Sequence, residues 1–204
     1  MRCLAGRLTS YAIVITMTLM VFGCKGSSPP INFYTLTPIP VTQGPDSAGA
    51  ALRDIQIGIG PVAFPKVLDR PQIVTRPAPG RLNMAEFQRW GGYFKDDFML
   101  VLASNISTLL GTDQVLVHPW PGSLKPSYQI EIEVYRFDGK LGDSVVLNAG
   151  WILKTPDPAR AVSLKRATIV QVVTGDDYDA LVAAKNGALE KLSRLILDEM
   201  KNII

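Results

Sequence analysis

The sequence predicts an α+β fold, in which a mostly antiparallel sheet carries two main helices packed on one of its faces. Two observations lead to this prediction. Three runs between residues 128 and 173 alternate apolar with polar side chains and are joined by turns, which is typical of an antiparallel meander. Two other segments, residues 92–110 and 178–200, repeat apolar side chains every three or four positions, which is typical of helices with one buried face.

Short β-prone runs precede the first of these helices. The run at 32–36 is followed by a loop rich in proline and glycine. Ile55, Ile57 and Ile59 then alternate with polar or small residues, which predicts a half-buried strand. Gly58 and Gly60 within it indicate that another group packs closely against this strand.

A strand at 72–76 and a partner at 81–84 are predicted to form a hairpin around the break at Pro77–Gly80. The helix over 92–110 is expected to end at Gly111, and a short strand follows at 114–117.

The last predicted helix begins after Asp176 or Asp177, either of which can cap its amino end. Its apolar stripe includes Leu181, Leu189 and Leu192, and the opposite, polar side is expected to carry Lys185 together with Glu190, Lys191, Arg194 and Glu199.

Composition excludes several classes of function. The chain has 204 residues, enough for one domain, and 47% of them are apolar. Its net charge is +3, and two of the basic residues lie in the first 23 positions, so the body is nearly neutral and does not resemble a nucleic-acid-binding protein. His118 is the single histidine, which excludes metal sites built from several histidines.

The first 23 residues have the pattern of a secretory leader. Arg2 and Arg7 precede an uncharged run at 11–22. As a helix, those twelve residues would span about 18 Å, less than the roughly 30 Å of a hydrocarbon core. We therefore interpret residues 1–23 as a signal peptide rather than a membrane-spanning helix.

The leader ends in Val21-Phe22-Gly23-Cys24, which resembles the lipobox of bacterial lipoproteins. The resemblance implies that Cys24 becomes the acylated first residue of the mature protein, and several acyl chains together give durable anchoring. The alternative is an ordinary signal peptide followed by a chance cysteine. Residues 24–31 read as a short tether. An Asp at position 25 would favour the inner membrane, but this sequence has Lys25. In this respect it resembles the outer-membrane lipoproteins that face the periplasm.

Several short segments of residues 32–204 together carry a family resemblance. The most specific is the block Leu68-Asp-Arg-Pro-Gln-Ile-Val-Thr-Arg76, and the others are Phe33–Leu36, Ile59–Val62, Asn83, Arg89-Trp90, Pro119-Trp120 and Phe137–Gly139. Together they resemble the ABC-type transport auxiliary lipoprotein family. The resemblance implies a non-enzymatic component of the cell envelope. Its expected partners are an MCE-domain protein and, in many systems, an ABC permease and ATPase, and the assembly would move lipids or other hydrophobic compounds between membranes. It implies no cofactor other than the covalent lipid on Cys24. It is also compatible with assembly of the chain into a homo-oligomer.

We selected the candidate partner-binding residues from the segments that carry this resemblance. These residues are Leu68, Asp69, Arg70, Pro71, Gln72, Trp90 and Trp120. Each also has a purely structural interpretation: Asp69 can cap a turn and pair with Arg70, and a tryptophan can simply fill the core.

Two other functions stay open from the residues alone. The protein could carry a lipid by itself, which requires an apolar cavity between the sheet and the helices. It could also be an envelope hydrolase, because Glu131 and Glu133 share one strand face about 7 Å apart, a spacing used by glycosidases. Ordinary alternation already explains both carboxylates as part of a solvated face.

Overall fold

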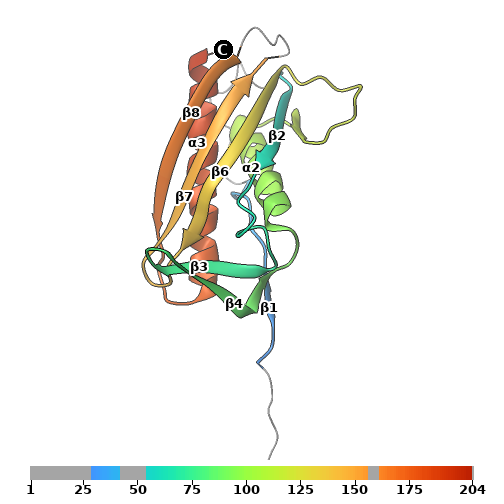
Figure 1. Cartoon of the computed structure of the whole chain (residues 1–204). Helices are drawn as coiled ribbons and strands as arrows, with labels where there is room; N and C mark the ends of the chain where they lie inside the picture. The colour runs from blue at the N-terminus through green and yellow to red at the C-terminus, as the bar shows by residue number, and fades with distance from the viewer. Residues whose placement is uncertain (1–28, 42–53, 156–160, 204) are drawn as a thin grey trace, which may run out of the picture. The chain divides into compact units, whose positions relative to one another are not determined.

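The computed structural model describes residues 29–41, 54–155 and 161–203. The predicted leader and Cys24 lie outside the described residues. The described chain forms an α+β fold (Figure 1). Its elements are β1 (Asn32–Tyr34), β2 (Ile57–Ala63), β3 (Gln72–Ala78), β4 (Arg81–Trp90), α2 (Phe94–Leu110), β5 (Val115–Val117), β6 (Tyr128–Gly139), β7 (Ser144–Lys154), β8 (Ala161–Val172) and α3 (Tyr178–Ile203).

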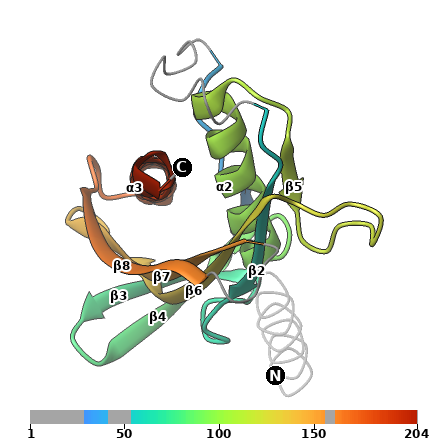
Figure 2. The same cartoon turned by 90° about the horizontal axis from the view of Figure 1, so that it is seen from above.

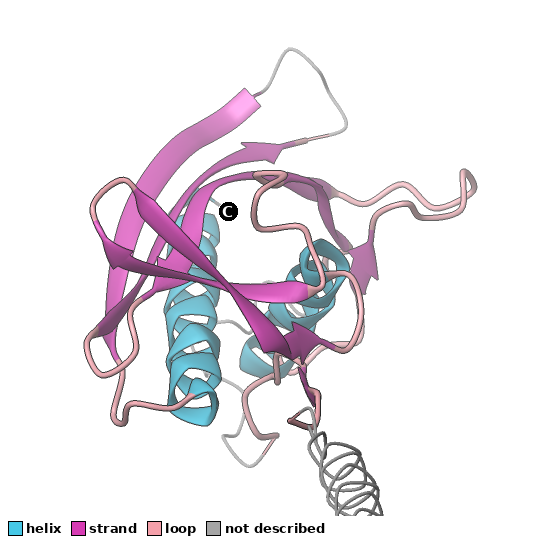
Figure 3. Cartoon of the chain, turned by 60° about the horizontal axis from the view of Figure 1, so that its bottom comes forward, coloured by secondary structure: helices cyan, strands magenta, loops and turns pink. Residues whose placement is uncertain are grey.

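The strands form two sheets. A five-stranded sheet has the order β5-β2-β6-β7-β8, and a three-stranded sheet has the order β1-β4-β3. The predicted meander is confirmed, because β6, β7 and β8 pair in antiparallel fashion along most of their length. The β3–β4 hairpin is also antiparallel, and the three-stranded sheet lies across one end of the molecule (Figure 3).

Strand β2 pairs in parallel with both of its neighbours, β5 and β6. Parallel pairing needs a long crossover, and here the β3–β4 hairpin and α2 carry the chain back to the same end of the sheet. The internal position also explains why β2 differs from the half-buried strand that was predicted. Residues 57–60 are buried without alternation, because strands flank β2 on both edges and groups cover both of its faces.

Both helices cover the same face of the five-stranded sheet (Figure 2). Their predicted limits hold to within a few residues, and Gly111 ends α2 in a left-handed conformation as expected. The side-chain carboxylate of Asp177 caps α3 by accepting a hydrogen bond from the backbone N–H of Ala180 at 2.8 Å. The core lies between the helices and the sheet, and includes Phe98, Leu102, Ile106, Leu181, Leu189, Leu192, Ile57, Ile59, Ile130, Leu147 and Leu153.

The segment after β1 is fixed to both helices by hydrogen bonds. Its main-chain N–H groups at Leu36 and Ile39 donate to Asp97 (2.6 Å) and Asn105 (2.9 Å) of α2. Asn105 is buried and donates in turn to Ser193 of α3 at 3.3 Å. Burial raises the pKa of Asp97, and the hydrogen bond from Leu36 opposes that rise. The amino-terminal strand is thus attached to the core over several residues.

Replacing Asn105 should loosen this attachment. Asn105→Ala leaves the buried N–H of Ile39 without its acceptor, so we expect a loss of about 2 kcal/mol in the free energy of unfolding, measured by chemical denaturation. Asn186→Ala is the matched control, because Asn186 contacts Thr37 at an exposed position, and should cost under about 1 kcal/mol. Equal losses in the two variants would contradict the role assigned to Asn105.

Candidate functional site

The block 68–72 forms an outer turn between β2 and β3. The backbone N–H groups of Leu68 and Asp69 both donate to the carbonyl of Pro65, at 2.9 and 3.2 Å. The Leu68 side chain is buried and anchors the turn, whereas Asp69 and Pro71 are exposed. The sequence therefore places one apolar anchor beneath a short polar loop, which gives the loop a defined shape.

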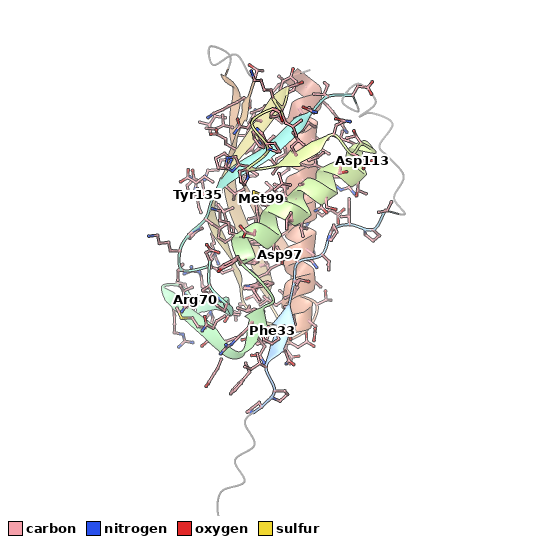
Figure 4. The ribbon with its side chains drawn as sticks, turned by 90° about the vertical axis from the view of Figure 1, so that its right-hand side faces the viewer. Phe33, Arg70, Asp97, Met99, Asp113 and Tyr135 are labelled. Atoms are coloured by element: carbon pink, nitrogen blue, oxygen red, sulfur yellow. The ribbon has the colours of Figure 1, made fainter. Side chains whose placement is uncertain are left out.

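Arg70 lies along the outside of the three-stranded sheet instead of pairing with Asp69. Its Nε donates to Oε1 of Gln72 at 3.1 Å, and its Nη1 lies 2.8 Å from the sulfur of Met84. Figure 4 shows Arg70 toward the same end of the molecule as Phe33 of β1, away from Asp113. Asp69 is left on the turn with its carboxylate exposed.

Trp90 lies directly behind this block and is buried. Its backbone N–H donates to the carbonyl of Pro71 at 2.7 Å, which joins the end of β4 to the block. Its ring stacks on Phe94 with centroids 4.2 Å apart, and only 5% of the residue is exposed. Trp90 and Leu68 therefore support the turn from inside, and Asp69, Arg70, Pro71 and Gln72 form its accessible part.

An aromatic cluster supports the block from the core. We use this name for five residues whose rings meet at centroid distances of 4.2–5.8 Å, in stacked and edge-on pairs: Phe64, Trp90, Phe94, Phe98 and Phe137. Such pairs add about 0.5–1.5 kcal/mol each beyond the area they bury. These ring pairs join β4, α2 and β6 behind the turn at 68–72.

Lys185 of α3 enters this cluster and is fully buried, which differs from the polar side predicted for it. Its Nζ donates to the carbonyl of Phe137 at 2.7 Å. The same nitrogen lies 4.3 Å from the ring centroid of Phe137 and 5.0 Å from that of Phe94. Burial lowers the pKa of Lys185 from 10.5 to about 7, and the nearby charge of Asp138 opposes that fall.

Asp138 is the buried anion next to this lysine. Its carboxylate accepts hydrogen bonds from Nε and Nη2 of Arg76, at 3.0 and 2.8 Å, and from Nε of Arg136 at 2.8 Å. Burial alone would raise the pKa of Asp138, but the two guanidinium groups outweigh that effect and hold it below the usual value. Asp138 thus binds the two arginines, while the carbonyl of the preceding residue, Phe137, binds Lys185.

Trp120 lies apart from the block and from Trp90. It packs over the beginning of β2, where a Cβ added at Gly58 would stand 2.8 Å from its ring. At Gly60, whose φ is +108°, an added Cβ would stand 2.9 Å from the Cβ of His118. The close packing expected at the two glycines is therefore confirmed, and the β5–β6 loop of the same chain supplies it.

Glu131 and Glu133 line an apolar groove on the sheet face opposite the helices. The groove has a volume of about 310 Å³ and is also lined by Tyr135, Ile152 and Leu164. Glu131 is ion-paired with Lys154 at 2.6 Å, and Glu133 accepts a hydrogen bond from the Tyr135 hydroxyl at 2.7 Å. Both carboxylates are engaged by neighbouring side chains, while the space between sheet and helices is occupied by the buried core.

Sequence reasoning missed Lys185 and its charged neighbours. A usable signal was present, because Lys185 lies four residues after Leu181 and four before Leu189, on the apolar stripe of its helix. The partnership of Asp138 with Arg76 had no such signal, since 62 residues separate them.

The described ranges contain neither a candidate metal cluster nor a candidate membrane-spanning helix. No group of three or more His, Cys, Asp or Glu side chains there could hold a metal ion. Neither α2 nor α3 combines the length and apolar character needed to cross a bilayer.

Comparison with known proteins gives one family match. The family described as the ABC-type transport auxiliary lipoprotein component matches residues 34–197. The crystal structure of an uncharacterized protein has a TM-score of 0.68 with 17% identity, and covers 84% of this chain and 99% of its own. A Xanthomonas campestris protein has a TM-score of 0.66 with 19% identity and the same two coverages. Identities this low establish likeness of fold alone. None of the curated proteins matches the chain.

Titration of Lys185 should make stability depend on pH. Its pKa is about 7 in the folded protein, against 10.5 as the ordinary value, so between these values the unfolded chain binds the extra proton. Raising the pH therefore stabilises the fold, by about 1.4 kcal/mol per pH unit from about pH 8 to 10. The control is Lys185→Met, which keeps an unbranched apolar stem and does not titrate.

The measured quantity is the difference in free energy of unfolding between wild type and Lys185→Met, followed by tryptophan fluorescence in denaturant. This difference should rise with pH in favour of wild type. A difference that stays flat from pH 7 to 10 would contradict the titration assigned to the buried amine.

Proposed function

The chain belongs to the ABC-type transport auxiliary lipoprotein family, and from this premise we propose that it is a non-enzymatic, lipid-anchored subunit of an MCE-type transport system. In this proposal it docks onto an MCE-domain protein through the turn at 68–72. An ABC permease and ATPase complete the system, which moves lipids or other hydrophobic compounds between membranes.

Anchoring is proposed through acyl chains on Cys24, in the outer membrane and facing the periplasm. Two features support it: the lipobox-like sequence that ends at Cys24, and the hydrogen bonds that attach the segment after β1 to both helices. A tether that starts from a strand fixed to the core would hold the whole domain near the membrane. A tether from a frayed terminus would not.

The observation that carries the docking proposal is an exposed polar turn mounted on a rigid aromatic base. Asp69 and Pro71 are exposed, while Leu68 beneath them and Trp90 behind them are buried. Because the turn is already ordered, binding a partner costs little conformational entropy. An exposed carboxylate in a defined position also favours recognition by charge.

A non-enzymatic role agrees with how the polar side chains are used. The buried ones described above are engaged in structural contacts, from Asn105 with Ser193 to Asp138 with its two arginines. Glu131 and Glu133 are held by Lys154 and Tyr135. These contacts stabilise the fold and leave the accessible turn at 68–72 as the feature suited to a partner.

The anchor can be tested by metabolic labelling with a radioactive fatty acid. Wild-type protein should incorporate label, and Cys24→Ala should lose essentially all of it, because the thiol is the acceptor of the first acyl chain. Cys3→Ala is the matched control and should be labelled like wild type. Label retained in Cys24→Ala would place the modification elsewhere.

The docking turn can be tested by co-purification from native membrane extract. Asp69→Lys reverses one exposed charge, so recovery of the MCE-domain protein should fall at least about tenfold. Asp113→Lys makes the same charge change away from the turn (Figure 4) and should leave recovery unchanged. The proposal fails if neither variant alters recovery, or if wild type recovers no MCE-domain protein.

A further inference from the structure

A second feature of the surface is a pocket of about 560 Å³ between the β3–β4 turn and the β6–β7 turn. Three cationic side chains line it, Arg76, Arg136 and Lys140, with Pro77–Pro79 as an apolar wall. Asp143 and Ser144 complete the lining. We call this feature the basic pocket. The side chains come from strands far apart in sequence, so the fold itself assembles the charge.

The two arginines of the basic pocket are held in place from below. The side chain of Asp138, only 1% exposed, binds both guanidinium groups. Arg76 and Arg136 remain 27% and 38% exposed, so each presents part of its guanidinium to the pocket. A planar group fixed on one edge by a buried carboxylate is already oriented for a ligand on the other edge.

Several N–H groups of these two arginines are not bonded to Asp138. Arg76 uses Nε and Nη2 on Asp138, and Arg136 uses Nε. Within the described ranges, no acceptor is bonded to Nη1 of Arg76 or to either terminal nitrogen of Arg136. Lys140 makes an exposed ion pair with Asp143 at 3.2 Å, which is weak and exchangeable in water.

From this arrangement we propose that the basic pocket binds a phosphate group, either on the headgroup of a phospholipid or as free phosphate. The tetrahedral oxygens of a phosphate suit the fork of donors that a guanidinium presents. Arg136 and Arg76 bind two of its oxygens, and Lys140 turns from Asp143 to a third. Asp143 limits the affinity, because it is the one carboxylate in the lining.

The lipid source rests on the proposed function, because it needs the anchor at Cys24. The three-stranded sheet that ends in this pocket also contains β1, and it lies across one end of the molecule (Figure 3). Eight residues lead from Cys24 to the start of β1 at Asn32, and eight residues span at most about 28 Å. That end of the domain therefore stays within reach of headgroups when Cys24 is acylated.

Titration calorimetry on the full chain in a nonionic detergent tests the site. The first arm uses inorganic phosphate and does not depend on the anchor. The second arm uses mixed micelles that contain phosphatidylglycerol, with diacylglycerol micelles as the control that lacks phosphate. We expect wild type to bind in the first arm, and binding in the second arm that is absent with diacylglycerol identifies a headgroup as the source.

Three variants and one control make the outcome specific. Lys140→Gln and Arg136→Lys should each weaken phosphate binding at least about fivefold, the second without changing net charge, because the fork of donors is lost. Asp143→Asn should tighten binding. Lys125→Gln removes an exposed charge from the β5–β6 loop and should have no effect.

The results separate the two proposals. Phosphate binding with no response to phosphatidylglycerol keeps the site and assigns it to soluble phosphate. Wild-type protein that takes up no fatty-acid label would remove the membrane argument without touching the first arm. The phosphate site is overturned if wild type binds neither ligand, or if Lys125→Gln weakens binding as much as Lys140→Gln does.

Discussion

The buried amine of Lys185 is the contact on which the centre of this fold depends. It bonds to the carbonyl of Phe137 in β6 and lies against the rings of Phe94 in α2 and Trp90 in β4. One side chain of α3 therefore touches three other elements, from both sheets and the other helix. Removing such a group from water is costly, and a hydrogen bond together with several ring faces is what offsets that cost.

Phe137 and Asp138 are adjacent in β6 and connect this interior to the surface. The carbonyl of Phe137 accepts a hydrogen bond from Lys185. The carboxylate of the next residue, Asp138, binds the two arginines of the basic pocket. Neighbouring residues of a strand face opposite ways, so a single strand serves the core on one side and the pocket on the other. Removing Asp138 would leave both guanidinium groups without their buried partner, so the arrangement of the basic pocket depends on this strand.

Local patterns made the helices and the meander predictable. Alternation in β6 to β8 and apolar spacing in α2 and α3 depend on neighbouring residues, and the structure follows them. Features set by distant residues were not predictable in the same way. The parallel pairing of β2 depends on where the crossover returns the chain to the sheet. The close contact of Trp120 with Gly58 depends on a loop that lies more than fifty residues later in the sequence. The charge of Lys185 predicts the polar face of α3, whereas its spacing from Leu181 and Leu189 predicts the apolar stripe, and the structure follows the spacing.

The candidate site shows the same division between local and distant information. The block 68–72 was identified from the sequence, but which of its residues are accessible depends on Trp90 and the aromatic cluster behind it. The turn and the basic pocket both adjoin the three-stranded sheet, whose third strand is β1. With Cys24 acylated, the features proposed to meet a partner and a phosphate would therefore lie toward the anchored end of the domain. A subunit built in this way would hold its partner near the membrane by position alone, without a catalytic group.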